Sequence, residues 1–202
     1  MKLFVYNEPT PHIILDDVYS DADMQTMLDE MRGLRSAFKP PEETGSARGE
    51  DRRPLKTNHG LYLEDNHSDS VILKLNRRAF DRVTFVALQS LFPQVKLDNW
   101  YSNTLINYYD DGQEYKPHVD TSTFTFITFF EREHDGGDFV FADYNYTVEQ
   151  RPNRIVVFEG KVKHAVTPIR FTDKTKEGRY SMAQFLFARR THDTRACNVG
   201  NA

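Results

Sequence analysis

The chain has 202 residues, of which 39% are hydrophobic and 28% charged, and its formal charge is −4 at pH 7. This composition is typical of a soluble globular protein and gives no electrostatic footprint for nucleic acid or anionic lipid. No apolar run approaches the roughly 18 residues of a membrane span, and the single cysteine, Cys197, excludes an intramolecular disulfide. Because the N-terminus also lacks a long apolar stretch, a cytoplasmic location is expected.

We expect a single domain over residues 1–202, because a chain of this length can bury one sizeable core. Residues 1–99 are expected to supply helical support, and residues 100–188 a β-rich core. Residues 189–202 are expected to form a tail.

The N-terminal part carries two helical patterns separated by a polar segment. Ser20, three residues before an aspartate and followed by methionines and leucine at helical spacing, predicts a helix from about 20 to 35. Residues 39–54 mix prolines, glycines and charges of both signs, which predicts a mobile loop, either an inert surface loop or an active-site lid. An apolar stripe over residues 69–91, stopped by Pro93, predicts a second and longer helix.

Beyond the second helical pattern the hydrophobic period changes from helix to strand. Short segments rich in β-branched and aromatic residues follow one another, separated by glycine, asparagine, aspartate or proline. The segments are "NWYSNTLINYY", "TFTFITFF", "GDFVFADY", "RIVVFEG", "VKHAVTPI" and "RYSMAQFLFA". Helices followed by at least six strands indicate an α+β, mainly β chain, closed as a sandwich or jelly roll with the helices against one sheet.

The segment "YDDGQEYKPHVD" ends in His118-Val119-Asp120, directly before an expected strand. Random placement produces a His-x-Asp about 0.6 times in a chain of this composition, so the spacing alone is weak evidence. The other such pair, His67-Ser68-Asp69, precedes the second helix, where Ser68 or Asp69 is better explained as an N-cap. At the edge of a strand, His118 and Asp120 project from the same face and could reach one ion.

A metal site of this kind needs a third ligand, and His164 is the best candidate because it lies in another expected strand, "VKHAVTPI". The remaining candidates are read as surface or capping histidines: His12, His59, His134 and His192. Two imidazoles and one carboxylate form the ligand set of a non-haem Fe(II) oxygenase, although catalytic zinc also uses such a set.

Arg179 and Ser181 alternate along the apolar strand "GRYSMAQF" and so project from one face. An arginine that points into a β-core is costly unless a carboxylate meets it, and its planar fork suits bidentate carboxylate binding. A 2-oxo dicarboxylic acid could supply that carboxylate while its 2-oxo acid end chelates the metal. Tyr109 could donate a phenolic hydroxyl to the same acid, and the competing interpretation of Arg179 is a structural salt bridge.

Together these residues resemble the Fe(II)- and 2-oxoglutarate-dependent dioxygenases, and within them the prolyl 4-hydroxylase-like branch. The motif Tyr-x-x-Gly-x-x-Tyr-x-Pro-His-x-Asp of that branch is matched at Tyr109, Gly112, Tyr115, Pro117, His118 and Asp120. "GGDFVF" is similar to a Gly-Gly-x-x-x-Phe turn, and "VVFEGKVKHAVTPI" with "GRYSMAQF" resembles the closing part. The resemblance covers about residues 100 to 188.

The resemblance implies a double-stranded β-helix, or jelly-roll, core and a specific set of site residues. His118, Asp120 and His164 would bind iron, and Arg179 would bind the far carboxylate of 2-oxoglutarate, assisted by Tyr109. Ser181 would help if its hydroxyl faces the same pocket. The implied cofactors are Fe(II), 2-oxoglutarate as cosubstrate, O2, and ascorbate as reductant. The implied reaction hydroxylates a C–H bond, releasing succinate and CO2, and the implied partner is a peptide or protein that contains proline.

Two departures from the family pattern affect these expectations. The polar segment "RFTDKTKE" lengthens the gap between His164 and Arg179. Arg179 can still act as the anchor only if its strand re-enters the sheet in register. Some relatives also carry a tyrosine on the strand after the His-x-Asp, where this chain has Phe129 or Thr128, and Thr128 is expected to substitute as a hydroxyl donor.

Other functions remain open on the sequence alone. A free amino acid or other small molecule would require a closed pocket rather than a groove. Alkylated nucleic acid is disfavoured by the acidic net charge and by Phe185, where the repair enzymes of the superfamily place a further arginine. A non-catalytic jelly-roll binding protein would be expected to lose a ligand or the anchor, and a zinc hydrolase gives no reason for Arg179.

Overall fold

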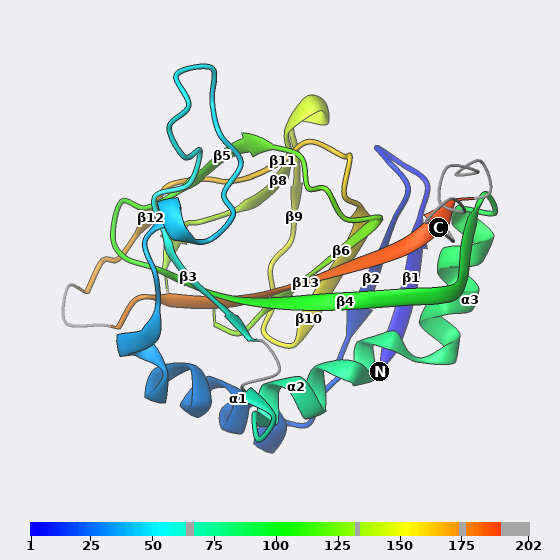
Figure 1. The fold of residues 1–202 in the computed structure, drawn as a ribbon, viewed down its shortest axis with the longest axis horizontal. Coiled ribbons are helices and arrows are strands. Elements are labelled where there is room, and N and C mark those ends of the chain that lie inside the picture. Colours follow the sequence, from blue (N-terminus) through cyan, green and yellow to red (C-terminus); the bar gives the residue numbers. More distant parts are fainter. Residues whose placement is uncertain (64–66, 132–133, 174–176, 191–202) are drawn as a thin grey trace, which may run out of the picture.

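The structure is a computed structural model, and it describes residues 1–63, 67–131, 134–173 and 177–190. Its largest element is an antiparallel sheet of seven strands that crosses the whole molecule (Figure 1). In spatial order the strands are β1 (Lys2–Tyr6), β2 (His12–Asp16), β10 (Arg154–Glu159), β6 (Phe124–Phe129), β13 (Arg179–Arg190), β4 (Val95–Tyr109) and β3 (His59–Leu63).

A smaller sheet lies over one face of the large one. Its order is β5 (Tyr115–His118), β11 (His164–Val166), β8 (Phe139–Phe141) and β9 (Tyr146–Val148), and a two-stranded piece joins β12 (Ile169–Arg170) to β7 (Asp135–Gly136). Between the two sheets lies an apolar cluster that includes Phe129, Phe139, Phe141 and Phe158. Burial of these rings by both sheets drives the closure of the sandwich. The mainly β, jelly-roll class expected from the sequence is therefore confirmed.

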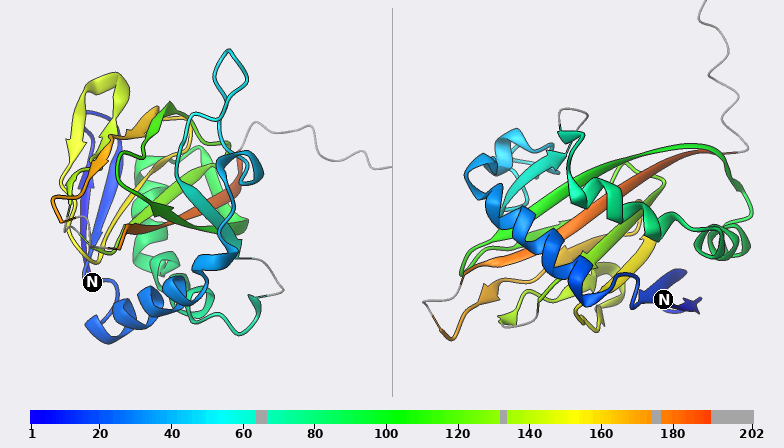
Figure 2. Two further views of the ribbon diagram at one scale, coloured as in Figure 1. Left: turned by 90° about the vertical axis from the view of Figure 1, so that its left-hand side faces the viewer. Right: turned by 90° about the horizontal axis from the view of Figure 1, so that it is seen from below.

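The opposite face of the large sheet is covered by the helices, as Figure 2 shows from two directions. α1 (Asp21–Gly33) begins with a capping box between Ser20 and Asp23, and its buried face carries Met27 and Met31. These methionines share one apolar cluster with sheet residues such as Phe126. The first predicted helix is thus present with nearly the expected ends.

The single long helix predicted over residues 69–91 is wrong. The structure has α2 (Val71–Leu75), a 3-10 helix over Asn76–Phe80 and α3 (Arg82–Leu91). The backbone carbonyl of Asn76 accepts a hydrogen bond from the Gln184 side chain at 3.1 Å instead of continuing the α-helical ladder. Asp81 then adopts an extended conformation and caps α3, its carboxylate accepting from the Thr84 amide at 2.7 Å.

Two further local expectations need correction. The N-cap of α2 is Ser70, not Ser68 or Asp69. His12 lies on β2, is only 1% exposed and stacks on Tyr6, so it is a core residue rather than a surface or capping histidine.

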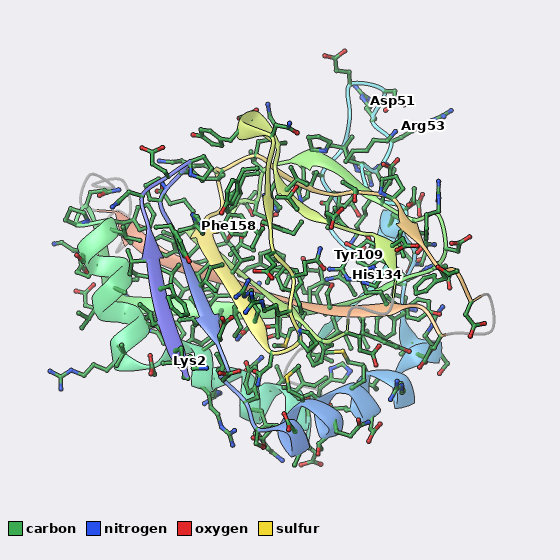
Figure 3. The ribbon with its side chains drawn as sticks, turned by 180° about the vertical axis from the view of Figure 1, so that it is seen from behind. Lys2, Asp51, Arg53, Tyr109, His134 and Phe158 are labelled. Carbon is green, nitrogen blue, oxygen red and sulfur yellow. The ribbon has the colours of Figure 1, made fainter. Side chains whose placement is uncertain are left out.

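The segment 39–54 projects from the body of the molecule beside β5, and Figure 3 labels Asp51 and Arg53 near its tip. It contains a 3-10 turn at Pro41–Glu43 and a hairpin closed by an isolated bridge between Arg48 and Pro54. At its base Thr44 is buried, so part of the segment packs on the domain. Among the described residues no helix is long and apolar enough to cross a membrane.

Candidate metal and cosubstrate site

His118, Asp120 and His164 converge between the two sheets. One ligand atom from each lies within 4.8 Å of the other two, and this is the one such group of metal-binding side chains in the described part of the chain. His118 ends β5 and faces His164 directly across the β5–β11 pair. Nε2 of His118 lies 3.7 Å from Oδ1 of Asp120, and Nε2 of His164 lies 3.4 Å from Oδ2.

The two imidazoles are oriented by their backbones. Nδ1–H of His118 donates to the carbonyl of Lys116 at 2.8 Å, and Nδ1–H of His164 donates to the carbonyl of Val162 at 2.9 Å. Each hydrogen bond leaves the lone pair of Nε2 free and directed at the Asp120 carboxylate. Burial, with a smaller effect from His164, lowers the pKa of His118 to about 3, so the ring is neutral and able to bind a metal.

Asp120 reaches the site in a different way from the one the sequence suggested. β5 ends at His118, so strand alternation does not place the carboxylate. Instead the Asp120 amide donates to the carbonyl of Gly160 at 2.7 Å, and Thr125 Oγ1 donates to Oδ2 at 2.6 Å. A Cβ on Gly160 would lie 2.3 Å from the carbonyl oxygen of Ser122, so this close backbone approach requires glycine.

Thr125 is a site residue that the sequence reasoning missed. It lies on β6 and is fully buried, and a second hydrogen bond at 2.8 Å links its hydroxyl to that of Ser122. The signal that could have found it is strand alternation. Phe124 and Phe126 belong to the cluster under the helices, so Thr125 between them must face the opposite sheet.

The donor set fits a divalent metal ion. Two neutral imidazole nitrogens and one carboxylate oxygen, all buried or nearly so, offer three ligands with one negative charge. Three protein ligands leave coordination positions for other ligands. Of the histidines not assigned to the site, His12, His59 and His134 lie outside this group, and His192 lies outside the described residues.

Arg179 lies at the start of β13 and is only 2% exposed. It pairs in register with Tyr109 of β4, so the chain re-enters the sheet in register after the polar segment "RFTDKTKE". Residues 174–176 of that segment lie outside the described part. Its guanidinium donates to the carbonyl of Gly137 at 3.2 Å and lies 5.3 Å from the centre of the Tyr109 ring.

The charge of Arg179 has no carboxylate partner within ion-pair distance among residues 1–63, 67–131, 134–173 and 177–190. Burial lowers the pKa of this guanidinium from its ordinary value, which expresses the cost of holding the charge in the interior. Burial also raises the pKa of Tyr109 to about 12, so its phenol remains protonated as a hydrogen-bond donor. The Tyr109 side chain, labelled in Figure 3, is only 3% exposed.

Ser181 and Thr128, the two hydroxyls considered as cosubstrate contacts, lie on opposite faces of the large sheet. Ser181 is two residues from Arg179 on β13, is buried and shares its face. Thr128 pairs with Met182 and Ile155, both of which belong to the cluster under the helices. Its hydroxyl therefore points away from Arg179, and the expected role of Thr128 as a donor to the cosubstrate is wrong.

A cavity of about 270 Å³ opens beside Asp120. The base of the 39–54 segment forms one wall of this cavity, and side chains from β3, β4, β5 and β13 form the others. Tyr115 separates the cavity from His118, on whose ring it stacks with centres 3.5 Å apart, and its hydroxyl accepts from the Ala47 amide at 3.1 Å. The lining residues used below are Lys56, Tyr62, Asn103, Tyr115, Val119 and Asp120.

Residues 104–187 match the family model described as the 2OG-Fe(II) oxygenase superfamily. No curated protein sequence matches the chain. The matched segment contains every residue assigned above to the metal and cosubstrate site, and the resemblance inferred from the sequence is confirmed at the level of the superfamily.

Solved structures share the fold at low sequence identity. A prolyl-4-hydroxylase from Pseudomonas putida superposes with a TM-score of 0.65 at 18% identity, covering 88% of this chain and 92% of its own. A viral collagen prolyl hydroxylase from Paramecium Bursaria Chlorella virus-1, solved with 2OG, gives 0.60 at 14% identity, covering 89% and 96%. A 2OG-Fe(II) oxygenase family oxidoreductase from Burkholderia pseudomallei gives 0.58 at 13% identity, covering 89% and 86%.

The match to this superfamily supports the general oxygenase reaction, with Fe(II), 2-oxoglutarate and O2 as its reactants. The His-Asp-His group described above supplies the residues that such a centre needs.

Proposed function

We propose that this protein is an Fe(II)- and 2-oxoglutarate-dependent hydroxylase that acts on a prolyl residue of a peptide or protein. His118, Asp120 and His164 hold the iron, Arg179 holds the far carboxylate of 2-oxoglutarate, and Tyr109 and Ser181 assist. When bound, iron supplies the activation of O2 that couples decarboxylation of 2-oxoglutarate, to succinate and CO2, with insertion of oxygen into a substrate C–H bond. Ascorbate would keep the metal reduced.

The observation that carries the proposal is the buried charge of Arg179, which has no ion-pair partner among the described residues. A buried guanidinium without a carboxylate is costly to the free protein, and a dicarboxylic acid supplies the missing partner in the geometry that a planar fork prefers. A zinc hydrolase built on the same two histidines and aspartate has no use for this charge. The alternative of a structural salt bridge for Arg179 has no partner among the described residues.

The side chains around the ligands keep water away and fix the ligands in place. Tyr115 covers one face of His118, and Phe158 packs edge-on against His164 with ring centres 4.7 Å apart. Thr125 holds the carboxylate of Asp120 by one hydrogen bond. A ligand set held in this way undergoes little reorganisation when a metal binds or when the reaction proceeds.

The proline assignment is supported by the motif around Tyr109 to Asp120 and by the two prolyl hydroxylases that share the fold. The site cavity lies against the projecting 39–54 segment, which could lie along a bound peptide. A free amino acid is the second candidate, and the buried amino group of Lys56 in the same cavity favours it, because an α-carboxylate would pair with that charge.

The test is a screen of proline-containing peptides with the purified protein, Fe(II), 2-oxoglutarate and ascorbate, read by mass spectrometry. We expect at least one peptide to gain a single oxygen atom, with one succinate formed per hydroxylation, and no gain with His118→Ala. Succinate formation without any peptide product would indicate that the substrate is a small molecule rather than a prolyl peptide. Absence of succinate under all conditions would refute the oxygenase assignment itself.

A further inference from the structure

Lys56 places an amino group inside the cavity beside the metal-binding group. The residue is only 2% exposed and follows the 39–54 segment. Its backbone is fixed by an isolated bridge to Tyr115, and the neighbouring Leu55 carbonyl accepts from the Lys116 amide at 2.9 Å. The position of Lys56 is therefore set by the same strand, β5, that carries His118.

The ammonium group of Lys56 has no anionic partner in the part of the chain that the structure describes. It makes neither an ion pair nor a hydrogen bond there, and it lies over the Tyr115 ring, whose centre is 5.9 Å away. Other lysines differ in this respect, since exposed Lys2 and Lys163 pair with Asp17 and Asp143. A contact of 5.9 Å with a ring offsets only a small part of the cost of burying a charge.

Asp120 does not supply the missing partner. It is the one carboxylate among the residues that line this cavity, and its two oxygens lie 3.7 and 3.4 Å from the histidine nitrogens instead. Burial lowers the pKa of Lys56 to about 8, with a smaller opposing effect from Asp120, so the group still carries its charge at neutral pH. A metal ion beside Asp120 would make the surroundings of Lys56 more positive.

The cosubstrate has its own cation in a different place. Arg179 borders a separate cavity with Arg32, Glu131 and His134, whereas it is not among the residues that line the cavity of Lys56. The two buried cations thus border two different cavities, and only the cavity of Lys56 is also lined by a metal-binding residue, Asp120.

We infer that Lys56 is a specificity-determining residue that binds a carboxylate of the substrate. The inference rests on the proposed oxygenase function and specifies its substrate as an acidic one. The carboxylate has two sources with the same chemistry: the α-carboxylate of a free or C-terminal residue, or the side chain of an aspartate or glutamate beside the residue that is hydroxylated. Tyr62 and Asn103, which also line the cavity, offer further hydrogen bonds to such a group.

The experiment compares matched acid and amide probes on the wild type, Lys56→Met, Lys56→Arg and the exposed control Lys2→Met. One pair is N-acetylproline and N-acetylprolinamide, which tests the α-carboxylate. The other pair is a capped proline peptide with glutamate, or with glutamine, beside the proline. Binding is measured by calorimetry on the protein loaded with Zn²⁺ and 2-oxoglutarate, and kcat/KM is measured with Fe(II).

We expect the wild type and Lys2→Met to prefer one acid over its amide, and the pair that shows the preference identifies the source. Lys56→Met should weaken binding of that acid by about 10- to 100-fold, the usual effect of losing a hydrogen bond to a charged group, and leave the amide unaffected. Lys56→Arg should keep most of the preference.

Three results would overturn the inference. The wild type could bind neither acid better than its amide, or Lys56→Met could weaken acid and amide equally, as a purely structural role would. Lys56→Met could also weaken the binding of 2-oxoglutarate as strongly as Arg179→Met does, which would show that the lysine binds the cosubstrate. If no succinate forms with Fe(II), the oxygenase function fails, while the calorimetric comparison still decides the role of Lys56.

Discussion

Arg179→Met removes the charge of the proposed cosubstrate anchor while keeping most of its apolar stem. In the free protein the guanidinium makes one hydrogen bond, to the Gly137 carbonyl at 3.2 Å, and no ion pair within the described residues. The substitution therefore removes few interactions from the folded protein, but it removes the buried cation that pairs in register with Tyr109.

The expected loss of affinity follows from the bonds that a carboxylate would form. Two charge-assisted hydrogen bonds at about 1.5 kcal/mol each amount to about 3 kcal/mol, or a dissociation constant for 2-oxoglutarate about 150-fold higher. The free energy of unfolding without ligand should stay the same or rise, because an uncompensated buried charge is replaced by an apolar side chain of similar size.

The assay is calorimetric titration of 2-oxoglutarate into the Zn²⁺-loaded protein, with thermal unfolding of the apo protein in parallel. Arg151→Met is the control, because Arg151 is exposed and, among the described residues, forms an ion pair only with Glu149, so it should change neither quantity by a measurable amount. Unchanged affinity for 2-oxoglutarate in Arg179→Met would refute the anchor. A loss of about 3 to 5 kcal/mol in stability would instead reveal a structural ion pair.

Further substitutions test how the site and the fold are held. Thr125→Val should weaken metal affinity about 10- to 100-fold, because Asp120 loses its hydrogen bond. The control is Thr128→Val, on the other face of the same strand, which should leave metal affinity unchanged. Equal effects of the two substitutions would refute the assigned faces. Gly160→Ala should reduce both metal affinity and melting temperature, since the added carbon has no room, and unchanged values would contradict the close approach. Asp81→Ala should lower the free energy of unfolding in denaturant by about 1 kcal/mol, because α3 loses its N-cap. Metal binding should not change. An unchanged free energy of unfolding would show that the cap is dispensable.

The sequence predicted those parts of the fold that depend on local patterns. The helix that begins after Ser20 has a capping box and a regular apolar stripe, and both features are local. The break between α2 and α3 depends instead on Gln184, more than one hundred residues away, whose side chain occupies the carbonyl of Asn76. A tertiary contact of this kind overrides helix propensity and leaves no mark in the local pattern.

The candidate site shows the same division. Strand alternation correctly put Arg179 and Ser181 on one face, because both belong to one regular strand. It failed for Asp120, which lies beyond the end of β5 and is positioned by Gly160 and Thr125 from other strands. The orientation of Thr128 could be predicted from the sequence, since the alternating phenylalanines of β6 indicate which residues face the helices.

The central claim is that the group of His118, Asp120 and His164 holds iron for turnover of 2-oxoglutarate. The measurement that tests it most directly is succinate formation by the purified protein with Fe(II), O2, ascorbate and 2-oxoglutarate, compared between the wild type and His118→Ala. We predict succinate from the wild type, and loss of both succinate and bound iron in the variant, with Thr128→Val active as the control. Equal succinate formation by the wild type and His118→Ala, or none from a wild type that has bound iron, would contradict the account.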